Sequence, residues 1–168
     1  MMKIEEFSKK YLVRILNEKD IPIIYNLCCG NPIYYEFCPP FVTQTSILED
    51  MVVLPPGKDK KDKYYVGFFD SDKLIAVMDF IDGYPEKNIA FIGFFMTDTS
   101  IQGKGISTEI ISELCKYLRQ LHYESVRLAY VKGNEQSKGF WHKNNFVENG
   151  IETKNENYTA VITQRMLW

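Results

Sequence analysis

Apolar residues form three nearly continuous runs in the middle of the chain, at residues 63–70, 73–82 and 88–97. Short segments rich in turn-forming residues separate the runs. Runs of this length predict strands, and the scarcity of polar positions within them is typical of strands covered on both faces. Because the connections are short, we expect the three strands to be antiparallel neighbours.

Helical spacing replaces this pattern after the third run and predicts a helix over residues 105–121. Its apolar stripe consists of Ile106, Ile110, Leu114, Leu118 and Leu121. Charged residues fall on the opposite face, as expected for a helix that packs on a sheet. Residues 125–131 predict the next strand, and a strand, helix, strand unit is nearly always a right-handed crossover. Strands 88–97 and 125–131 should therefore be parallel.

The remaining pattern predicts further elements on both sides of this unit. Further strands are expected at residues 11–16, 146–152 and 157–167. Helices are expected after Asn17, whose cap pairs with Asp20, after Thr43 or Thr45, and from 134 to 145. Residues 34–41 are expected to form a turn-rich connection. The predicted fold is α/β in the mixed α+β sense. One domain over 1–168 contains a mostly antiparallel mixed sheet of six or seven strands with helices on both faces.

Composition and charge argue against several classes of protein. Of the 168 residues, 45% are hydrophobic and 25% charged, which is typical of a folded protein in water. The formal net charge of -2 argues against nucleic-acid binding through a general basic field. No secretory signal or membrane span is visible, so a cytoplasmic location is expected. The cysteines form no C-x-x-C pair, which argues against a metal site and favours four buried thiols, Cys28, Cys29, Cys38 and Cys115.

The segment TDTSIQGKGIST, residues 97–108, joins the third apolar run to the predicted helix. The first amides of a helix lack partners within the helix and attract anions, above all a diphosphate. Gly103 and Gly105 remove side chains that would keep an anion away. Two common phosphate motifs do not fit, since Gly105 follows Lys104 and Thr108 replaces the third glycine of a dinucleotide fingerprint. A turn that is merely tight remains an alternative.

Two motifs resemble those of the GCN5-related N-acetyltransferases. QGKGIS, residues 102–107, is similar to the family's Q/R-x-x-G-x-G/A signature, and NEQSKGFWHKNNF, residues 134–146, is similar to N-x-x-S/A-x-x-F-Y-x-x-x-G-F. The order of predicted elements matches the family from residue 11 to 168. The resemblance implies an acyl-CoA N-acyltransferase-like fold and acetyl-CoA as co-substrate. It implies that a primary amine of a small molecule or peptide attacks the thioester directly. Many family members form homodimers, so a homodimer is also possible here.

The resemblance also assigns roles to residues. The cofactor-binding set that it implies is Phe95, Met96, Thr97, Gln102, Gly103, Lys104, Gly105, Ile106, Ser107, Thr108, Asn134 and Phe140. Ser107 and Asn145 depart mildly from the family pattern, whereas Trp141 replaces the tyrosine that often protonates the leaving thiolate. Because an indole N–H does not titrate usefully, Tyr130 is the candidate acid, or the thiolate leaves unassisted.

A base or a chain of waters must remove a proton from the attacking ammonium, and four carboxylates are candidates for the base. Asp79 lies within an apolar strand, and Glu36 lies in an aromatic connection; Asp82 and Asp98 are further candidates. Tyr34, Tyr35 and Phe37 are candidates for the aromatic wall of an acceptor pocket. Two functions compete with acetyl transfer: a non-catalytic module that binds or senses acyl-CoA, which Trp141 favours, and a plain nucleotide-binding domain.

Overall fold

The computed structural model describes residues 1–168 and contains a seven-stranded sheet. The strands are β1 (Leu12–Ile15), β2 (Lys63–Asp70), β3 (Lys73–Ile81), β4 (Ile89–Thr97), β5 (Ser125–Val131), β6 (Val147–Lys154) and β7 (Thr159–Met166). The α-helices are α1 (Ile21–Cys29), α2 (Pro32–Phe37), α3 (Gln44–Val52), α4 (Ile106–Gln120) and α5 (Glu135–Lys143). Every expected strand is present, with ends that differ from the expected ones by at most two residues.

The strand order in the sheet is β1-β2-β3-β4-β5-β7-β6. Only β4 and β5 are parallel, and all the other neighbouring strands are antiparallel. The predicted parallel crossover through α4 is therefore confirmed. The position of β7 between β5 and β6 was not predicted, because apolar periodicity carries no information about which strands pair.

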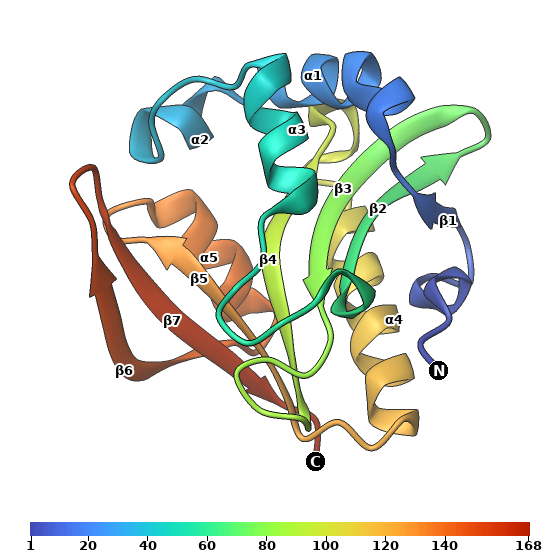
Figure 1. The fold of residues 1–168 in the computed structure, drawn as a ribbon, viewed down its shortest axis with the longest axis vertical. Coiled ribbons are helices and arrows are strands. Elements are labelled where there is room, and N and C mark those ends of the chain that lie inside the picture. The colour runs from blue at the N-terminus through green and yellow to red at the C-terminus, as the bar shows by residue number, and fades with distance from the viewer.

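Helices cover both faces of the sheet, as predicted. In Figure 1, α3 crosses in front of the sheet with α1 beside it, while α4 lies behind it. The larger cluster of buried residues lies on the α4 face and includes Phe80, Leu114 and Trp141. The smaller cluster lies between the sheet and α1 and α3, and includes Ile24 and Ile47. These two cores hold the sheet rigidly between its helices.

The structure contains the two predicted helix caps but differs in part from the predicted turn-rich connection. Asn17 and Asp20 form the expected reciprocal cap, which opens a 3₁₀ turn that leads into α1. Thr43, rather than Thr45, caps α3 through a hydrogen bond from Ser46. The turn-rich connection expected at 34–41 is wrong in part, because α2 begins at Pro32, whose fixed φ suits the first turn of a helix.

The structure also bears on two further predictions, that the four cysteines are buried thiols and that the chain has no membrane span. None of the cysteines is in a disulfide; Cys28 and Cys115 are buried, but Cys29 and Cys38 are only half-buried. The expectation of four buried thiols is thus wrong for two of them. None of the helices combines the length and the hydrophobicity that crossing a bilayer requires.

The pairing of β4 with β5 ends halfway along β4. The parallel register runs from Ile89 opposite Ser125 to Ile92 opposite Leu128 and goes no further. Beyond it, β4 remains paired to β3 through a bulge at which Gly93 is the additional residue. The last part of β4 therefore leaves its backbone groups on the β5 side unpaired, and a cleft opens where the two strands separate.

Candidate active site

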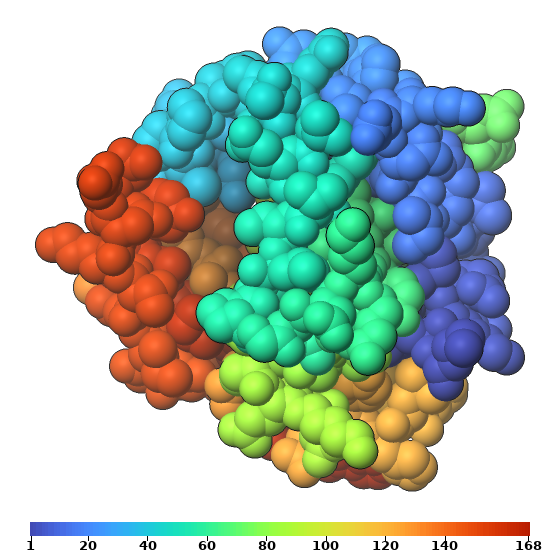
Figure 2. Space-filling view, in the orientation of Figure 1, coloured from blue at the N-terminus to red at the C-terminus, as the bar shows by residue number.

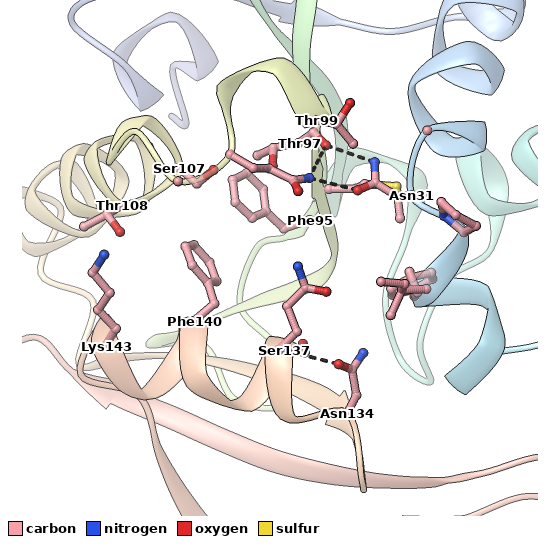
Figure 3. A pocket seen from close by; sticks show the side chains of 18 of the residues that line it. Asn31, Phe95, Thr97, Thr99, Ser107, Thr108, Asn134, Ser137, Phe140 and Lys143 are labelled. Atoms are coloured by element: carbon pink, nitrogen blue, oxygen red, sulfur yellow. Dashed lines mark hydrogen bonds between the residues drawn. The ribbon is translucent and has the colours of Figure 1, made fainter.

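A cleft of about 420 Å³ lies between the end of β4, the start of α4, and α5. The segment from α1 to α2 closes its fourth side (Figure 3). One end is apolar and the other polar. The apolar end is lined by Ile33, Tyr34, Phe95, Met96 and Phe140. The polar end is lined by Gly103, Gly105, Ser107, Thr108 and Lys143.

The start of α4 supplies the polar end of the cleft with backbone donors. Gly103 and Gly105 have φ values of 75° and 79°, a left-handed conformation that L side chains rarely adopt. A Cβ at either glycine would meet nothing within 4 Å, so the approach to the amides is open. No backbone N–H from Gly103 to Thr108 has an acceptor within the chain, and no side chain caps α4. This geometry suits an anion with several oxygens.

Gln102 anchors the loop to β4 rather than pointing along the cleft. Its side-chain amide donates to the Thr97 carbonyl at 3.0 Å and to Asn31 Oδ1 at 2.8 Å. Asn31 donates in turn to the same Thr97 carbonyl at 3.0 Å. The two amides thus tie the end of β4, the loop before α4 and the end of α1 into one rigid corner (Figure 3).

The opposite wall comes from the start of α5. Asn134 is 5% exposed, and its Oδ1 caps α5 by accepting from the Ser137 amide at 3.1 Å. The side-chain NH₂ of Asn134 makes no hydrogen bond within the chain, and the residue lines the cleft. The Phe140 ring stacks on Phe95 with centroids 6.2 Å apart, which joins α5 to β4 beneath the cleft.

Sequence reasoning missed several lining residues and included two that do not line the cleft. Lys143 points across the cleft toward Thr108 in Figure 3 and brings a cation to the free amides of α4. Its position one helical turn after Phe140 was the available signal. Lys104 is exposed, and neither it nor Ile106 lines the cleft with its side chain. These two residues contribute their backbone N–H groups only.

Asp79 belongs to β3, and its side chain lies on the face of the sheet that α3 covers. It is 8% exposed, and its Oδ2 accepts from the Lys63 ammonium at 2.7 Å. Its Oδ1 is buried and has no hydrogen-bond partner. Burial raises the pKa of Asp79 above its ordinary value, although the hydrogen bond from Lys63 opposes the rise. A buried carboxyl with a free oxygen and a raised pKa has the properties of a proton acceptor.

The other carboxylate candidates are placed less favourably. Glu36 is exposed on α2 and makes no ion pair. Asp82 accepts a hydrogen bond from the Tyr123 hydroxyl, on a part of the chain that does not line the cleft. Burial raises the pKa of Asp98, but hydrogen bonds from Ser100 outweigh burial and, with Lys73, lower it. We therefore retain only Asp79 of the four.

Tyr130 and Trp141 both lie in the core on the α4 face, outside the cleft lining. The Tyr130 hydroxyl donates to Glu148 Oε1 at 2.7 Å, and burial followed by this bond raises the pKa of Tyr130. Trp141 is 6% exposed and packs against Phe140 and Phe146 at centroid distances of 4.8 and 5.1 Å. Neither side chain is placed to meet a leaving thiolate.

The aromatic residues of α2 divide between two environments. Tyr34 lines the cleft, and its ring packs edge-on against Phe94 of β4, with centroids 5.7 Å apart. Tyr35 packs on Tyr34 at 4.9 Å. Phe37 reaches toward the loop before α5, since a Cβ at Gly133 would lie 4.0 Å from its ring. Tyr34 thus stands between the cleft and the α3 side of β4.

The sequence places the chain in a known family. Residues 31–146 match the model of the acetyltransferase (GNAT) family, which covers most of the chain. The protein belongs to this family of acetyltransferases. None of the curated proteins matches the chain in sequence.

Solved structures share the fold along nearly the whole chain. An acetyltransferase from Thermus thermophilus has a TM-score of 0.73 at 16% identity, with 94% of this chain and 97% of that chain covered. A spermidine N-acetyltransferase chimera from Vibrio cholerae and hSSAT has a TM-score of 0.69 at 17% identity, with 95% and 96% covered. The PaiA N-acetyltransferase from Thermoplasma acidophilum, in complex with coenzyme A, has a TM-score of 0.66 at 15% identity, with 93% and 98% covered.

Proposed function

We propose that the protein transfers the acetyl group of acetyl-CoA to a primary amine of a small molecule or peptide. The observation that carries the proposal is the row of free backbone N–H groups from Gly103 to Thr108 at the polar end of the cleft. These groups would hold the diphosphate, and Lys143 would add a positive charge beside it. Family membership and the coenzyme A complex of a structural neighbour support the same assignment.

The rest of the cleft would hold the pantetheine arm. The backbone groups near Phe95 that face away from β3 can pair with the amides of the arm as an added strand would, whereas the Thr97 carbonyl already accepts from Gln102 and Asn31. Asn134 would bond the arm from the α5 side through its unpaired NH₂. The stacked rings of Phe95 and Phe140 offer an apolar surface close to where β4 and β5 separate. The thioester would then lie near the bulge at Gly93.

The acceptor amine is the nucleophile, and it would attack the thioester from the side of β4 that faces α3. Asp79 would take the proton of the incoming ammonium, directly or through water, because an ammonium has no lone pair with which to attack. The amine nitrogen then bonds to the thioester carbon, and the carbon–sulfur bond breaks. The sulfur leaves as thiolate, which a thiol pKa near 8.5 permits without an acid, and the second proton that the nitrogen loses passes to the thiolate or to water. Backbone N–H groups of β4 would polarise the carbonyl oxygen.

The experiment is a turnover assay. Thiol release from acetyl-CoA is measured at about pH 8 with a panel of primary amines, and the acetylated product is identified by its mass increase. We expect release that depends on the amine and falls at least tenfold in Asp79→Asn. Release that is equal with and without every amine would contradict the proposal.

One observation favours a second function, a non-catalytic module that binds acyl-CoA. Trp141 occupies the position of the family's usual tyrosine and is buried in the core. Such a module would bind coenzyme A with the same cleft but would acetylate none of the amines. The turnover assay, with the affinity for coenzyme A measured on the same sample, distinguishes the two functions.

A further inference from the structure

A row of three side chains crosses the sheet on the face covered by α3. Tyr65 of β2 and Phe94 of β4 both stand directly opposite Asp79 of β3 in the strand register. Side chains of directly opposed residues share a face of the sheet, so the carboxyl lies between two aromatic rings. Tyr34 of α2 packs edge-on against Phe94 and extends this aromatic surface to the cleft.

A second carboxyl, Asp50 of α3, faces this row. Asp50 follows the buried Ile47 by three residues, so it lies toward the side of α3 that packs on the sheet. Its charge acts on Asp79 and Lys63 and on the hydroxyls of Tyr34 and Tyr65. It forms no ion pair or hydrogen bond within the chain, whereas Lys63 is bound to Asp79. Asp50 as a residue is exposed to solvent.

The two carboxylates, Asp79 and Asp50, carry more negative charge than the single neighbouring cation, Lys63, offsets. Lys63 offsets one of them through Asp79 Oδ2, but Asp79 Oδ1 is buried with no partner, and Asp50 has none. Burial, and then repulsion from Asp79, raises the pKa of Asp50 to about 6. A carboxylate that lacks a cation is costly in such surroundings, and a ligand ammonium would offset that cost. Aromatic faces nearby favour a cation as well.

The surface is hollowed beside α3, the helix that carries Asp50 (Figure 2). Figure 2 shows a hollow between α3 on one side and the β6–β7 hairpin on the other. At the α2 end, the Cys38 thiol lies beside the hydroxyls of Tyr34 and Tyr158, so the hairpin meets the end of α2. This contact narrows the hollow and favours a small acceptor over a folded protein.

We propose that this hollow binds a small primary amine that carries a second positive charge, with Asp50 as the residue that selects it. The inference rests on the proposed acetyl transfer and adds the substrate class. The reacting nitrogen lies beside Asp79, next to the bulge of β4, and the distal ammonium pairs with Asp50. A monoamine of the same length lacks the second contact, and an amine with a distal carboxylate is repelled.

The test compares acceptors that differ only in the distal group. Linear diamines from 1,3-diaminopropane to 1,6-diaminohexane are each compared with the monoamine and the ω-amino acid of the same length. Initial rates give kcat/KM for the wild type, Asp50→Asn and Glu49→Gln. Glu49 is the matched control, because it is the neighbouring exposed carboxylate on α3 and has no ion pair. Affinity for coenzyme A is measured for every variant.

We expect at least one diamine to exceed its monoamine at least tenfold in kcat/KM in the wild type. The preference should fall to about threefold or less in Asp50→Asn, through KM, and persist in Glu49→Gln. Coenzyme A affinity should not change. Equal kcat/KM for every diamine and monoamine pair, or a preference that survives in Asp50→Asn, would overturn the inference.

Calorimetric titration of the diamines into the coenzyme A complex separates this inference from the proposed function. Binding that is lost in Asp50→Asn supports the inference even where no acceptor is acetylated, and in that case only the proposed function fails. Absence of diamine binding to the wild-type complex, together with turnover of monoamines, would overturn the inference and leave acetyl transfer standing.

Discussion

The carboxylate of Asp79 lies directly against Gly93, the additional residue of the bulge in β4. A Cβ built on Gly93 would stand 2.9 Å from Asp79 Oδ2, closer than real Cβ contacts allow. The absence of a side chain at Gly93 therefore lets the proposed base reach the point where β4 and β5 separate. The same oxygen accepts the hydrogen bond from Lys63, so any shift of the carboxylate also disturbs this buried ion pair.

Gly93→Ala tests this relationship. The added methyl group must displace the carboxylate, because the opposing atoms belong to a short side chain fixed by Lys63. We expect kcat to fall at least tenfold and the free energy of unfolding to fall by about 1–3 kcal/mol. KM for acetyl-CoA should change little. Gly139→Ala, on α5 where a Cβ meets nothing within 4 Å, is the control and should keep full activity.

Lys143 provides a test of the electrostatics at the polar end of the cleft. Lys143→Ala removes the cation that faces the start of α4, and we expect the dissociation constant for coenzyme A to rise about three- to tenfold. The loss should shrink as salt is added, because an exposed charge is screened. Lys116→Ala, an exposed lysine farther along α4, should leave the affinity unchanged. Equal effects of the two substitutions would refute a specific role for Lys143.

Trp141→Phe distinguishes packing from catalysis. Trp141 packs against Phe95, Phe140 and Phe146, so the smaller ring should cost about 1–2 kcal/mol of stability. The chemical rate, measured in single turnovers below the melting temperature of the variant, should fall less than threefold. A loss of several orders of magnitude in a folded variant would show that the indole takes part in the reaction.

The raised pKa of Asp50 predicts how stability depends on pH. The folded carboxyl titrates at about 6 and its ordinary value is 3.8, so the folded state binds this proton more tightly. The contribution of Asp50 to stability therefore becomes less favourable as pH rises from about 4 to about 6. Because Asp50 is exposed and screened by solvent, we expect a difference of about 1 kcal/mol only.

Urea unfolding measures this difference. Asp50→Asn should be more stable than the wild type by about 1 kcal/mol at pH 7, and the difference should vanish near pH 4. Glu49→Gln should match the wild type at both values. A stability difference at pH 4 equal to that at pH 7 would show that Asp50 is not in the environment described.

The sequence was sufficient for the positions of the strands along the chain and for the loop before α4, but not for the order of the strands in the sheet. Apolar runs of limited length define the strands, and the glycines at 103 and 105 indicate a left-handed backbone, which the structure has. Asn145, expected to tolerate such a conformation, has a φ of 66°. These features depend on residues close together in the sequence, so local chemistry determines them.

Contacts between distant segments could not be predicted. Asn31 meets Gln102 and Thr97 because α1 ends against β4, and no local pattern indicates that meeting. Asp50 is an ordinary helix carboxylate in the sequence, and only the packing of α3 on the sheet brings it near Asp79. Tyr130 was a candidate acid because its strand was expected beside β4, but its side chain lies in the core and its hydroxyl donates to Glu148.

The affinity of coenzyme A for Gly105→Glu, measured by calorimetric titration, tests the central claim most directly. Gly57 also has a φ of 79° and open space around it, so Gly57→Glu introduces the same backbone strain and charge away from the cleft. We predict that Gly105→Glu raises the dissociation constant more than a hundredfold, because a carboxylate then stands among the diphosphate donors. Gly57→Glu should bind as the wild type does. Equal affinity in the two variants would contradict the assignment of the α4 amides as the diphosphate site.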